Sequence, residues 1–455
     1  MRLRQQSIRP ELAKYSLRAV PRYTSYPTAP HFHDGVTGET YSGWLASLDP
    51  GKPISLYLHL PYCKQACWYC GCNMKLAARY SPISDYAETL RAELRLLARQ
   101  LPARMTLSHL AWGGGTPTAL SPEDLTAIMD LVRELFDVAP GAELAIESDP
   151  RTLTQDMVET IGALGFTRAS FGIQEFDPKV QRTINRVQPP EMIASAVEAL
   201  REVGVSAMNF DLIYGLPHQT VESLVSTVET CVDLEPDRFA LFGYAHVPWV
   251  AKRQRMIPEE ALPGLNARLE QADAAAEALM AAGYVRIGMD HFARPEDELA
   301  RAAETGTLRR NFQGYTTDTA ETLLGVGASS IGRTPSGYVQ NLTETGAWAR
   351  AVEAGEFPIA RGIALGEDDR LRGRVIEELM CKGSVDLEEI ARGQASLDWY
   401  HAHLRALSGL ARDGLIELKG PRVTLTEAGA PLVRVVAAVF DTYLESGKAR
   451  HSVAV

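Results

Sequence analysis

Short apolar runs alternate with amphipathic helical stretches between residue 54 and about residue 248. This alternation is typical of βαβ units, in which a helix joins two parallel strands. Repeated right-handed crossovers curl such a sheet into a barrel or part of one, and the working face then lies at the carboxyl ends of the strands. The pattern therefore predicts an α/β fold, a partial (β/α)6 TIM-like barrel. Its six predicted strands are Ile54–Leu60, Leu107–Gly113, Glu143–Ser148, Arg168–Ile173, Ala207–Ile213 and Phe239–His246.

The pattern changes after about Gly366, where helical periodicity dominates. We expect three helices, a short pair of β-like runs and a last helix. The helices are predicted at Asp368–Met380, Leu387–Arg392 and Asp398–Asp413, and the β-like runs at Leu415–Leu418 and Arg422–Leu425. Helices ahead of a small hairpin also fit a DNA-binding winged helix, but Arg and Lys are not concentrated on the segment that would read DNA.

The first 22 residues carry six Arg or Lys residues and the single acid Glu11. Such a stretch is typical of a solvated arm or of a flap over an acidic substrate. The chain is therefore predicted to have three parts. Residues 1–50 form a basic N-terminal arm and a segment covering the active site, residues 51–360 form the partial barrel with its extension, and residues 361–455 form a mainly helical C-terminal domain.

Composition narrows the classes of function. The chain has 455 residues, 45% of them hydrophobic, and a formal net charge of −11, so it can bury a large core and is unsuited to nonspecific nucleic-acid binding. It shows no charged-then-apolar leader and no apolar run of membrane-spanning length. Four of its six cysteines are crowded together, which is typical of a reducing compartment. We expect a cytoplasmic protein with no nucleic-acid partner and no membrane span.

Three cysteines lie within eight residues, Cys63-x3-Cys67-x2-Cys70, directly after the first predicted strand. Thiolate is the ligand that iron–sulfur clusters and zinc prefer, and this spacing lets one loop bring several sulfurs to one metal centre. Three sulfurs leave a four-iron cluster one ligand short, whereas a structural zinc site would also need Cys72. Disulfides are a third interpretation. The spacing favours a metal centre and leaves its kind open.

Polar and small residues gather at the carboxyl ends of the first two predicted strands. Period-two alternation places Tyr57 and His59 on one face of the first strand, beside the cysteine loop. The second strand ends in the run Gly113–Gly115, where bare backbone can approach a ligand. Its spacing is not that of a dinucleotide or P-loop fingerprint.

The other strands end in the same way. Glu147 and Asp149 share a face at the end of the third, where a carboxylate can accept ribose hydroxyls or pair with an ammonium group, or else form an ion pair with Arg151. Gln174, Asp211 and the segment 244–248 close the remaining three. Recurrence on six strands favours one shared active-site mouth.

On these residues the chain resembles the radical S-adenosylmethionine (SAM) enzymes, whose signature is Cys-x3-Cys-x2-Cys with an aromatic residue, here Tyr69, before the last cysteine. It resembles most closely the family of oxygen-independent coproporphyrinogen III oxidases (dehydrogenases). The resemblance spans nearly the whole chain and is carried by Pro21–Pro27, Cys70–Asn73, Trp112–Thr118, Glu147–Arg151, Phe171–Gln174, Asp211–Pro217, Gly288–Arg294 and Arg310–Thr317.

The resemblance implies one [4Fe-4S] cluster held by Cys63, Cys67 and Cys70, with the fourth iron chelated by the amino and carboxyl groups of SAM. Cys72 resembles a nearby cysteine of the family that is not a ligand. The first of two SAM molecules would be contacted by Tyr57, Gly114, Glu147 and Ile331. The second would be contacted by Tyr69, Gly115, Thr116, Gln174, Arg186, Asp211 and Ala245. No protein side chain is named as catalytic, because the cluster and SAM carry the chemistry.

The function implied is anaerobic oxidative decarboxylation of two propionates of coproporphyrinogen III to vinyl groups. The product would be protoporphyrinogen IX in haem and porphyrin biosynthesis, formed through a 5′-deoxyadenosyl radical. The expected partners are coproporphyrinogen III as substrate and an electron donor and acceptor that the sequence does not identify, and we expect a monomer. Candidate cations for the propionates are Arg22, Arg186, Arg294, Arg309 and Arg310.

Three alternatives stay open at this point. A radical SAM-like haem chaperone shares the cysteine motif but would serve as a haem-binding module. A haem-degrading radical methyltransferase is another branch of the superfamily. A zinc-stabilised winged-helix regulator, from a different class, would need four closed sulfur ligands and a basic recognition surface.

Overall fold

The computed structural model describes residues 13–392 and 397–444, so most of the predicted basic arm lies outside the described residues. The chain divides into two compact units. We call residues 33–263 and 320–364 the barrel unit, and residues 1–32, 264–319 and 365–455 the terminal unit, since the latter contains both chain ends. The predicted division into residues 1–50, 51–360 and 361–455 stays a prediction.

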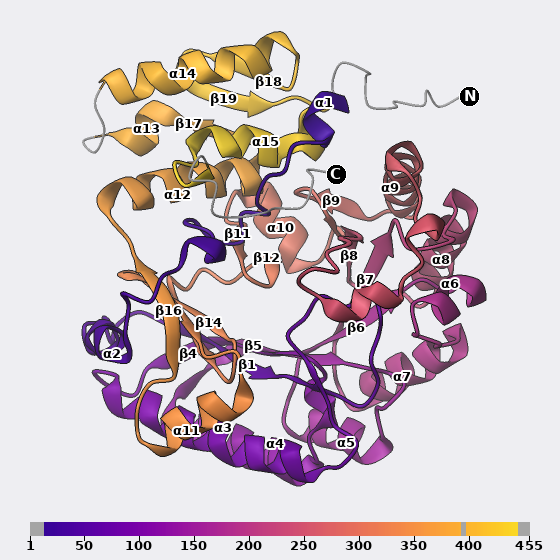
Figure 1. Cartoon of the computed structure of the whole chain (residues 1–455), viewed down its shortest axis with the longest axis vertical. Helices are drawn as coiled ribbons and strands as arrows, with labels where there is room; N and C mark the ends of the chain where they lie inside the picture. Colours follow the sequence, from indigo (N-terminus) through magenta and orange to yellow (C-terminus); the bar gives the residue numbers. More distant parts are fainter. Residues whose placement is uncertain (1–12, 393–396, 445–455) are drawn as a thin grey trace. The chain divides into compact units, whose positions relative to one another are not determined.

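Six parallel strands form the centre of the barrel unit (Figure 1). They neighbour one another in chain order and are β1 (Ile54–Leu60), β4 (Thr106–Gly114), β5 (Asp137–Ser148), β6 (Arg168–Gln174), β7 (Ala207–Tyr214) and β8 (Arg238–Gly243). β1 is flanked on its other side by β13 (Thr322–Val326), a parallel neighbour, after which β14 (Ile331–Thr334), β15 (Gly337–Asn341) and β16 (Ile359–Ala364) follow antiparallel. The predicted α/β partial barrel is confirmed.

Helices cover the outer face of this sheet (Figure 1). They are α3 (Ser81–Gln100), α4 (Pro122–Leu135), α5 (Gln155–Ala163), α6 (Pro178–Thr183), α7 (Pro190–Glu202) and α8 (Val221–Asp233). The expected start of α4 is confirmed, because the Ser121 hydroxyl accepts a hydrogen bond from the Asp124 amide at 3.2 Å. Leu56, Leu58 and Leu60 of β1 are at most 1% exposed, as expected for a strand buried beneath helices. The unit also contains α2 (Gly38–Ala46), α11 (Thr345–Glu353) and the two-residue strands β2 (Tyr62–Cys63) and β3 (Lys75–Leu76).

Two strand boundaries differ from the predictions by more than one residue. β5 begins at Asp137 rather than at Glu143, and its early part contains Pro140 and Gly141, which the sequence pattern assigns to a turn. The pairing of β5 with β4 shifts register at this point, so a bulge accommodates the two residues within the strand. β8 ends at Gly243 rather than at His246, since the residues that lead to Pro248 leave the ladder.

A buried carboxylate ties the extension of the barrel to its helical layer. Glu93 of α3 accepts hydrogen bonds from the Gly327 amide at 2.8 Å, the Trp348 indole at 2.8 Å and the Asn341 amide group at 2.6 Å. Burial raises the pKa of Glu93 to about 7. Three donors from three different elements compensate the desolvation of this one side chain, and they fix the turn between β13 and β14.

The terminal unit is mainly helical in its C-terminal part, as predicted. A three-stranded antiparallel sheet in the order β17-β19-β18 accompanies the helices, and its strand β17 was not predicted. Gly383 ends α12 in the left-handed conformation, with φ +66°, immediately before β17. The elements of the C-terminal part are α12 (Glu367–Lys382), β17 (Ser384–Asp386), α13 (Leu387–Ala391), α14 (Leu397–Arg412), β18 (Ile416–Lys419), β19 (Arg422–Leu425) and α15 (Val433–Ala437).

The rest of the terminal unit is built from short elements. They are α1 (Ala13–Ser16), α9 (Leu265–Ala281), β9 (Val285–Ile287), β10 (His291–Ala293), α10 (Glu298–Thr305), β11 (Arg309–Asn311) and β12 (Gly314–Thr316). β9 pairs with β10 and β11 with β12, both antiparallel. Among the described residues of the whole chain, no helix is both long enough and apolar enough to cross a membrane.

Candidate cofactor site

The cysteine loop follows β1 and is fixed by backbone hydrogen bonds at both ends. The Lys75 amide donates to the Pro61 carbonyl at 2.6 Å, and the Ala77 amide donates to the Cys63 carbonyl at 3.1 Å. In the middle of the loop, the Trp68 amide donates to the Ile184 carbonyl at 2.9 Å. These bonds close the ends of the loop onto each other and hold its middle against the end of α6.

Each of the three motif sulfurs accepts a hydrogen bond. The Thr116 hydroxyl donates to Cys63 Sγ, the guanidinium groups of Arg151 and Arg186 both donate to Cys67 Sγ, and the Cys72 amide donates to Cys70 Sγ, each at 3.4 Å. Donors aimed at sulfur stabilise the thiolate form that binds iron. The hydrogen bond between the Cys70 and Cys72 side chains, aided by the Cys72 amide, lowers the pKa of Cys70 to about 6.

The free thiols exclude one interpretation of the loop, and the donors to the sulfurs bear on the other two. All six cysteines are free, so the disulfide interpretation is wrong for this structure. Within residues 13–392 and 397–444, no group of three or more His, Cys, Asp or Glu side chains is placed to hold a metal ion. The set of three sulfurs with polar donors fits a sulfur-ligated cluster, and Cys72 is an exposed side chain beside it.

Glycines form a bed beside the loop. A Cβ added at Gly113 would lie 2.7 Å from Glu147 Oε1 and 2.9 Å from the Tyr57 hydroxyl. Gly114 has φ +114°, and its amide donates to Glu147 Oε2 at 3.1 Å. Bare backbone at these two positions lets the Glu147 carboxylate and the Tyr57 ring approach β4. The predicted residues Tyr57, Gly114 and Glu147 are thus brought together.

The carboxyl groups of Glu147 and Asp211 and the buried guanidinium of Arg186 set the charge of the site. Desolvation raises the pKa of both Glu147 and Asp211 to about 7. The charge of Glu147 adds to the rise at Asp211, and the charge of Cys70 adds to the rise at Glu147. Arg186 is 7% exposed and donates from Nε to the Gly172 carbonyl at 2.9 Å. Asp149 is different, because it forms a bidentate ion pair with Arg151 at 2.9 and 2.6 Å. Asp149 is therefore engaged by Arg151 while Glu147 is not, a difference that the sequence does not show.

A hydrogen-bonded chain supports Tyr57. Its hydroxyl lies 3.0 Å from His59 Nδ1, and His59 Nε2 lies 3.3 Å from the Ser329 hydroxyl. Burial lowers the pKa of His59 to about 4, so the ring is neutral at pH 7. Tyr57 also pairs in register with Gly325, where an added Cβ would meet the Ile331 carbonyl at 2.6 Å. Ser329 was not predicted, since its place beside β1 depends on the turn between β13 and β14.

Comparisons with known proteins decide the family. Residues 57–231 match the Radical SAM superfamily, and residues 365–432 match the HemN C-terminal domain. The chain is 50% identical over 450 residues to the oxygen-independent coproporphyrinogen III oxidase of Bradyrhizobium diazoefficiens, covering 98% of this chain and all of that one.

The chain belongs to the oxygen-independent coproporphyrinogen III oxidase family.

Further relatives agree with this membership. The Paracoccus denitrificans oxidase is 43% identical, with all of both chains covered. The solved structure of coproporphyrinogen III oxidase from Escherichia coli, described as a radical SAM enzyme, has a TM-score of 0.89 at 38% identity and covers 94% of this chain and 100% of that one. Membership of this family implies a [4Fe-4S] cluster and SAM as cofactors, with two SAM molecules consistent with the family.

Most residues assigned to a second SAM molecule by resemblance to the oxidase family lie at or just after the ends of strands, whereas Tyr69 lies in the cysteine loop and Arg186 follows α6. Gln254, which the sequence did not indicate, donates to the carbonyls of Tyr69 at 2.7 Å and Ala245 at 3.1 Å. Gln174 has φ +69°, and its side-chain oxygen is buried with no hydrogen-bond partner among the described residues. Such an orphaned acceptor fits a ligand that brings a donor. Gly115 and Thr116 are fixed by amide donation to Leu60 at 2.7 Å and Tyr62 at 2.8 Å.

Of the five arginines proposed for the substrate of the oxidase family, only Arg186 lies in the barrel unit. In the terminal unit, Arg309 forms a two-pronged contact with Glu377 at 2.8 and 3.3 Å, and Arg294 lies 3.9 Å from Glu296. Arg310 is 6% exposed and donates to the Arg22 carbonyl at 3.5 Å. Its Nε and Nη1 have no hydrogen-bond partner within the described part of the chain. A role of these arginines toward propionates stays a prediction.

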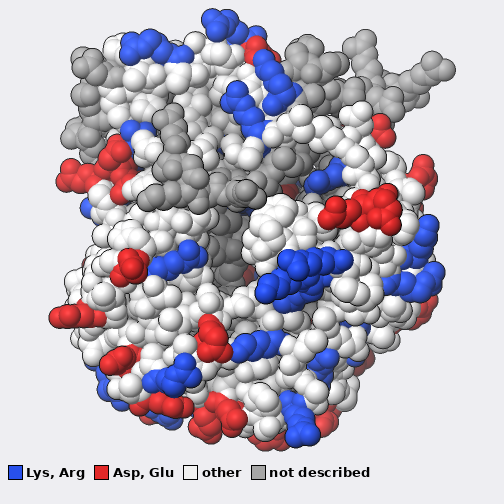
Figure 2. All heavy atoms as spheres, viewed as in Figure 1, with Lys and Arg blue, Asp and Glu red and all other residues white. Residues whose placement is uncertain are grey.

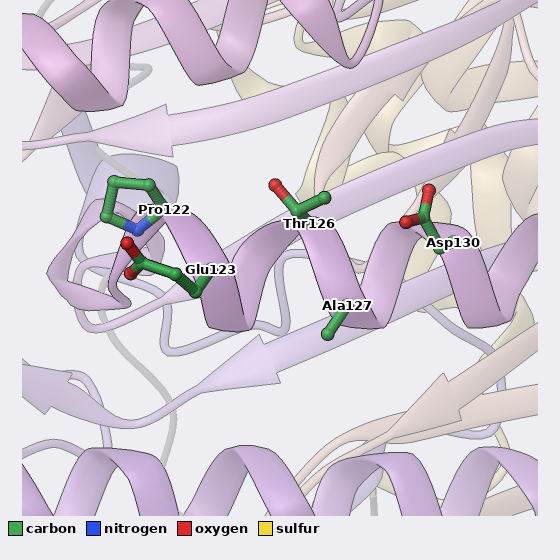
Figure 3. A pocket seen from close by; sticks show the side chains of 5 residues that line it. All are labelled: Pro122, Glu123, Thr126, Ala127 and Asp130. Atoms are coloured by element: carbon green, nitrogen blue, oxygen red, sulfur yellow. The ribbon is translucent and has the colours of Figure 1, made fainter.

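A pocket on the outer surface of α4 lies apart from the cysteine loop. Figure 3 shows the five side chains that line it, all from helix α4: Pro122, Glu123, Thr126, Ala127 and Asp130. None of them is among the predicted site residues of the oxidase family. The pocket therefore adds nothing to the site at the strand ends.

Proposed function

We propose that this chain catalyses the oxygen-independent oxidation of coproporphyrinogen III in haem biosynthesis. Two propionate side chains would each lose carbon dioxide and become vinyl groups, which gives protoporphyrinogen IX. The observation that carries the proposal is the three-sulfur loop beside the glycines of β4 and the Glu147 carboxylate, in a chain 50% identical over 450 residues to a named oxidase.

We propose Cys63, Cys67 and Cys70 as the cluster ligands. When bound, the cluster and SAM supply the one-electron chemistry that removes a hydrogen atom from the substrate. The chain supplies thiolates, and donors to them from Thr116 and Arg186. It also supplies a buried setting that keeps water and oxygen away. Tyr69 belongs to the same loop, and its backbone carbonyl is held by Gln254.

The chain's own residues would orient SAM by charge and hydrogen bonding. Ionised Glu147 would accept from the polar hydrogens of SAM while retaining the Gly114 amide. Asp211 would accept from a second SAM in the same way, and Arg186 would donate to an acceptor of that molecule. The full proposed set is Tyr57, Gly114, Glu147 and Ile331 for the first molecule, and Tyr69, Gly115, Thr116, Gln174, Arg186, Asp211 and Ala245 for the second.

The compartment, the oligomeric state and the electron partners of the chain are proposed as well. We infer that the chain acts in the cytoplasm, because four crowded free thiols, Cys63, Cys67, Cys70 and Cys72, persist only where the medium is reducing. We also propose that it is a monomer. An electron donor must reduce the cluster, and an acceptor must take the electron that the substrate releases with carbon dioxide.

The test is an anaerobic assay of the cluster-loaded full chain with SAM, a reductant and coproporphyrinogen III. We expect protoporphyrinogen IX, detected by chromatography after oxidation to the porphyrin. Tight haem binding by the same preparation without any vinyl product would contradict the proposal and favour the haem-binding module. A preparation from which SAM is omitted provides the matched control, and it should form no product.

A further inference from the structure

Exposed apolar side chains concentrate beside the cysteine loop. Nine large hydrophobic residues are exposed within the described part of the chain, and five of them lie in segments that border the loop. Three of the five follow β8: Trp249 at 57% exposed, Val250 at 71% and Met256 at 58%. The other two are Leu76 and Val187. Exposed Trp and Met side chains gathered in one place are typical of protein interaction surfaces.

Hydrogen bonds fix these bordering segments directly to the loop. On one side, the Asn185 side chain donates to the Ala66 carbonyl at 2.7 Å, and Val187 follows two residues later. On the other side, Arg253 donates to the Met74 carbonyl at 3.3 Å and Gln254 donates to the Tyr69 carbonyl at 2.7 Å. Trp249, Val250 and Met256 therefore belong to a segment bound to the loop that carries the cluster cysteines.

Cations lie among these apolar residues. Lys64 within the loop, Arg182 at the end of α6, and Lys252 and Arg255 beside Trp249 are all exposed. None of the four forms an ion pair with a residue that the structure describes. Figure 2 shows a continuous group of Lys and Arg atoms over the segment that follows β8, coloured pink in Figure 1. The chain as a whole carries a net charge of −11, so its composition does not account for a local group of unpaired cations.

We infer that this surface, defined by Lys64, Arg182, Trp249, Val250, Lys252 and Arg255, docks an acidic protein that carries a one-electron redox centre. The inference rests on the proposed function, because it assigns the site through which the cluster is reduced. One electron passes from the reduced donor centre to the oxidised cluster, and no bond is formed or broken. Lys64 and Gln65 are exposed between two cluster cysteines, so a donor docked here lies one loop from the iron.

The chemistry of the surface selects the kind of partner. Electron transfer slows steeply with distance, which favours docking over the loop that holds the cluster. Unpaired cations attract a negatively charged protein and raise its association rate by about 10- to 1000-fold at low salt. An exposed tryptophan supplies the apolar centre that transient redox complexes need in an interface below about 1,200 Å². Glu259 and Glu260 border the surface and limit it on one side.

The test measures reduction of the cluster in the loaded full chain, without substrate. The probe is a reduced flavodoxin, an acidic protein with one flavin, mixed anaerobically in a stopped-flow instrument while the visible absorbance of the cluster is followed. The double variant K252E/R255E should lower the second-order rate by about 10-fold or more at low salt. The neutral variant W249A should lower it as well, and added salt should slow the wild type more than the double variant.

Matched controls isolate the surface. The double variant R95E/R99E reverses the same number of exposed charges in the last turns of α3 and should leave the flavodoxin rate unchanged. Dithionite, a small reductant, should reduce wild type and W249A at equal rates. Binding of oxidised flavodoxin, measured by calorimetry, should weaken in K252E/R255E and not in R95E/R99E.

Equal flavodoxin rates and equal binding in wild type, K252E/R255E and W249A would overturn the inference. A loss of rate in R95E/R99E as large as in K252E/R255E would also overturn it, because the effect would then be one of net charge. Failure of the proposed function is a separate result, since it would be seen as normal reduction of the cluster with no vinyl product.

Discussion

Replacing Cys67 by alanine is expected to remove the iron–sulfur absorbance of the anaerobically purified chain and to lower vinyl formation to the background of the assay. Cys67 is buried, and its sulfur accepts hydrogen bonds from two guanidinium groups. Neither guanidinium can replace the thiolate as an iron ligand, because both are cations. Loss of even an outer-shell partner of a metal ligand costs about 10- to 100-fold, so loss of a ligand should exceed about 100-fold. Iron content, sulfide content and the rate of product formation are measured on one preparation.

Two other cysteines provide controls for this variant. Cys231 of α8 is a fully buried free thiol outside the loop, and C231A should keep its full iron content. Cys72 lies two residues after Cys70 and is proposed as a non-ligand, so C72S should also keep its iron and sulfide. Full iron content in C67A, or loss of iron in C72S with retention in C67A, would show that the ligand assignment is wrong.

Replacing Glu147 by glutamine is expected to weaken SAM binding by about 100-fold, or about 2.7 kcal/mol. The new amide would place a donor against the Gly114 amide, which now donates to Glu147 Oε2. It would also remove the charge that faces the cationic sulfonium and ammonium of SAM. The dissociation constant is measured by equilibrium dialysis of labelled SAM against the cluster-loaded chain.

The pH dependence of this binding gives a second readout. The pKa of Glu147 is raised to about 7, so the neutral form dominates below pH 7 in the free protein. A cationic ligand binds the ionised form better, and the affinity of the wild type should therefore rise with pH up to about 7 and then level off. In E147Q this rise should be lost or reduced, with Asp211 as the remaining group of raised pKa.

Glu143 offers a matched control on the same strand and the same face. It lies four residues before Glu147 in β5 and pairs with Arg168 at 2.9 Å. E143Q should cost some stability through this ion pair and leave the affinity for SAM unchanged. Equal affinities of wild type and E147Q for SAM would remove Glu147 from the proposed set.

The sequence predicted those elements whose pattern is local. β1 has the predicted bounds, because seven residues alternate between two turn signals and no proline or glycine interrupts them. β17 was missed, since three residues hold no period and the strand exists only through its pairing with β19. Pro140 and Gly141 hid the first part of β5, because a bulge that absorbs them is a property of the pair of strands and not of one strand.

In the site, too, positions set by local pattern could be predicted and contacts between distant segments could not. Tyr57, Glu147 and Asp211 were indicated by their positions at strand ends, which the order of elements alone determines. The different contacts of Glu147 and Asp149 could not be predicted, because both carboxylates share a face and only the contact with Arg151 separates them. Gln254 was missed, since its part is to hold two carbonyls of segments far apart in the sequence, Tyr69 and Ala245.

The central claim is that three cysteines hold the cluster and leave one iron for SAM. Mössbauer spectroscopy of the chain loaded with the enriched iron isotope tests it most directly, by comparing spectra recorded with and without SAM. The account predicts that one iron site in four changes its isomer shift when SAM is added, while the other three do not. Identical spectra in both conditions, from a chain that carries four irons and binds SAM, would contradict the account and point to Cys72 as a fourth ligand.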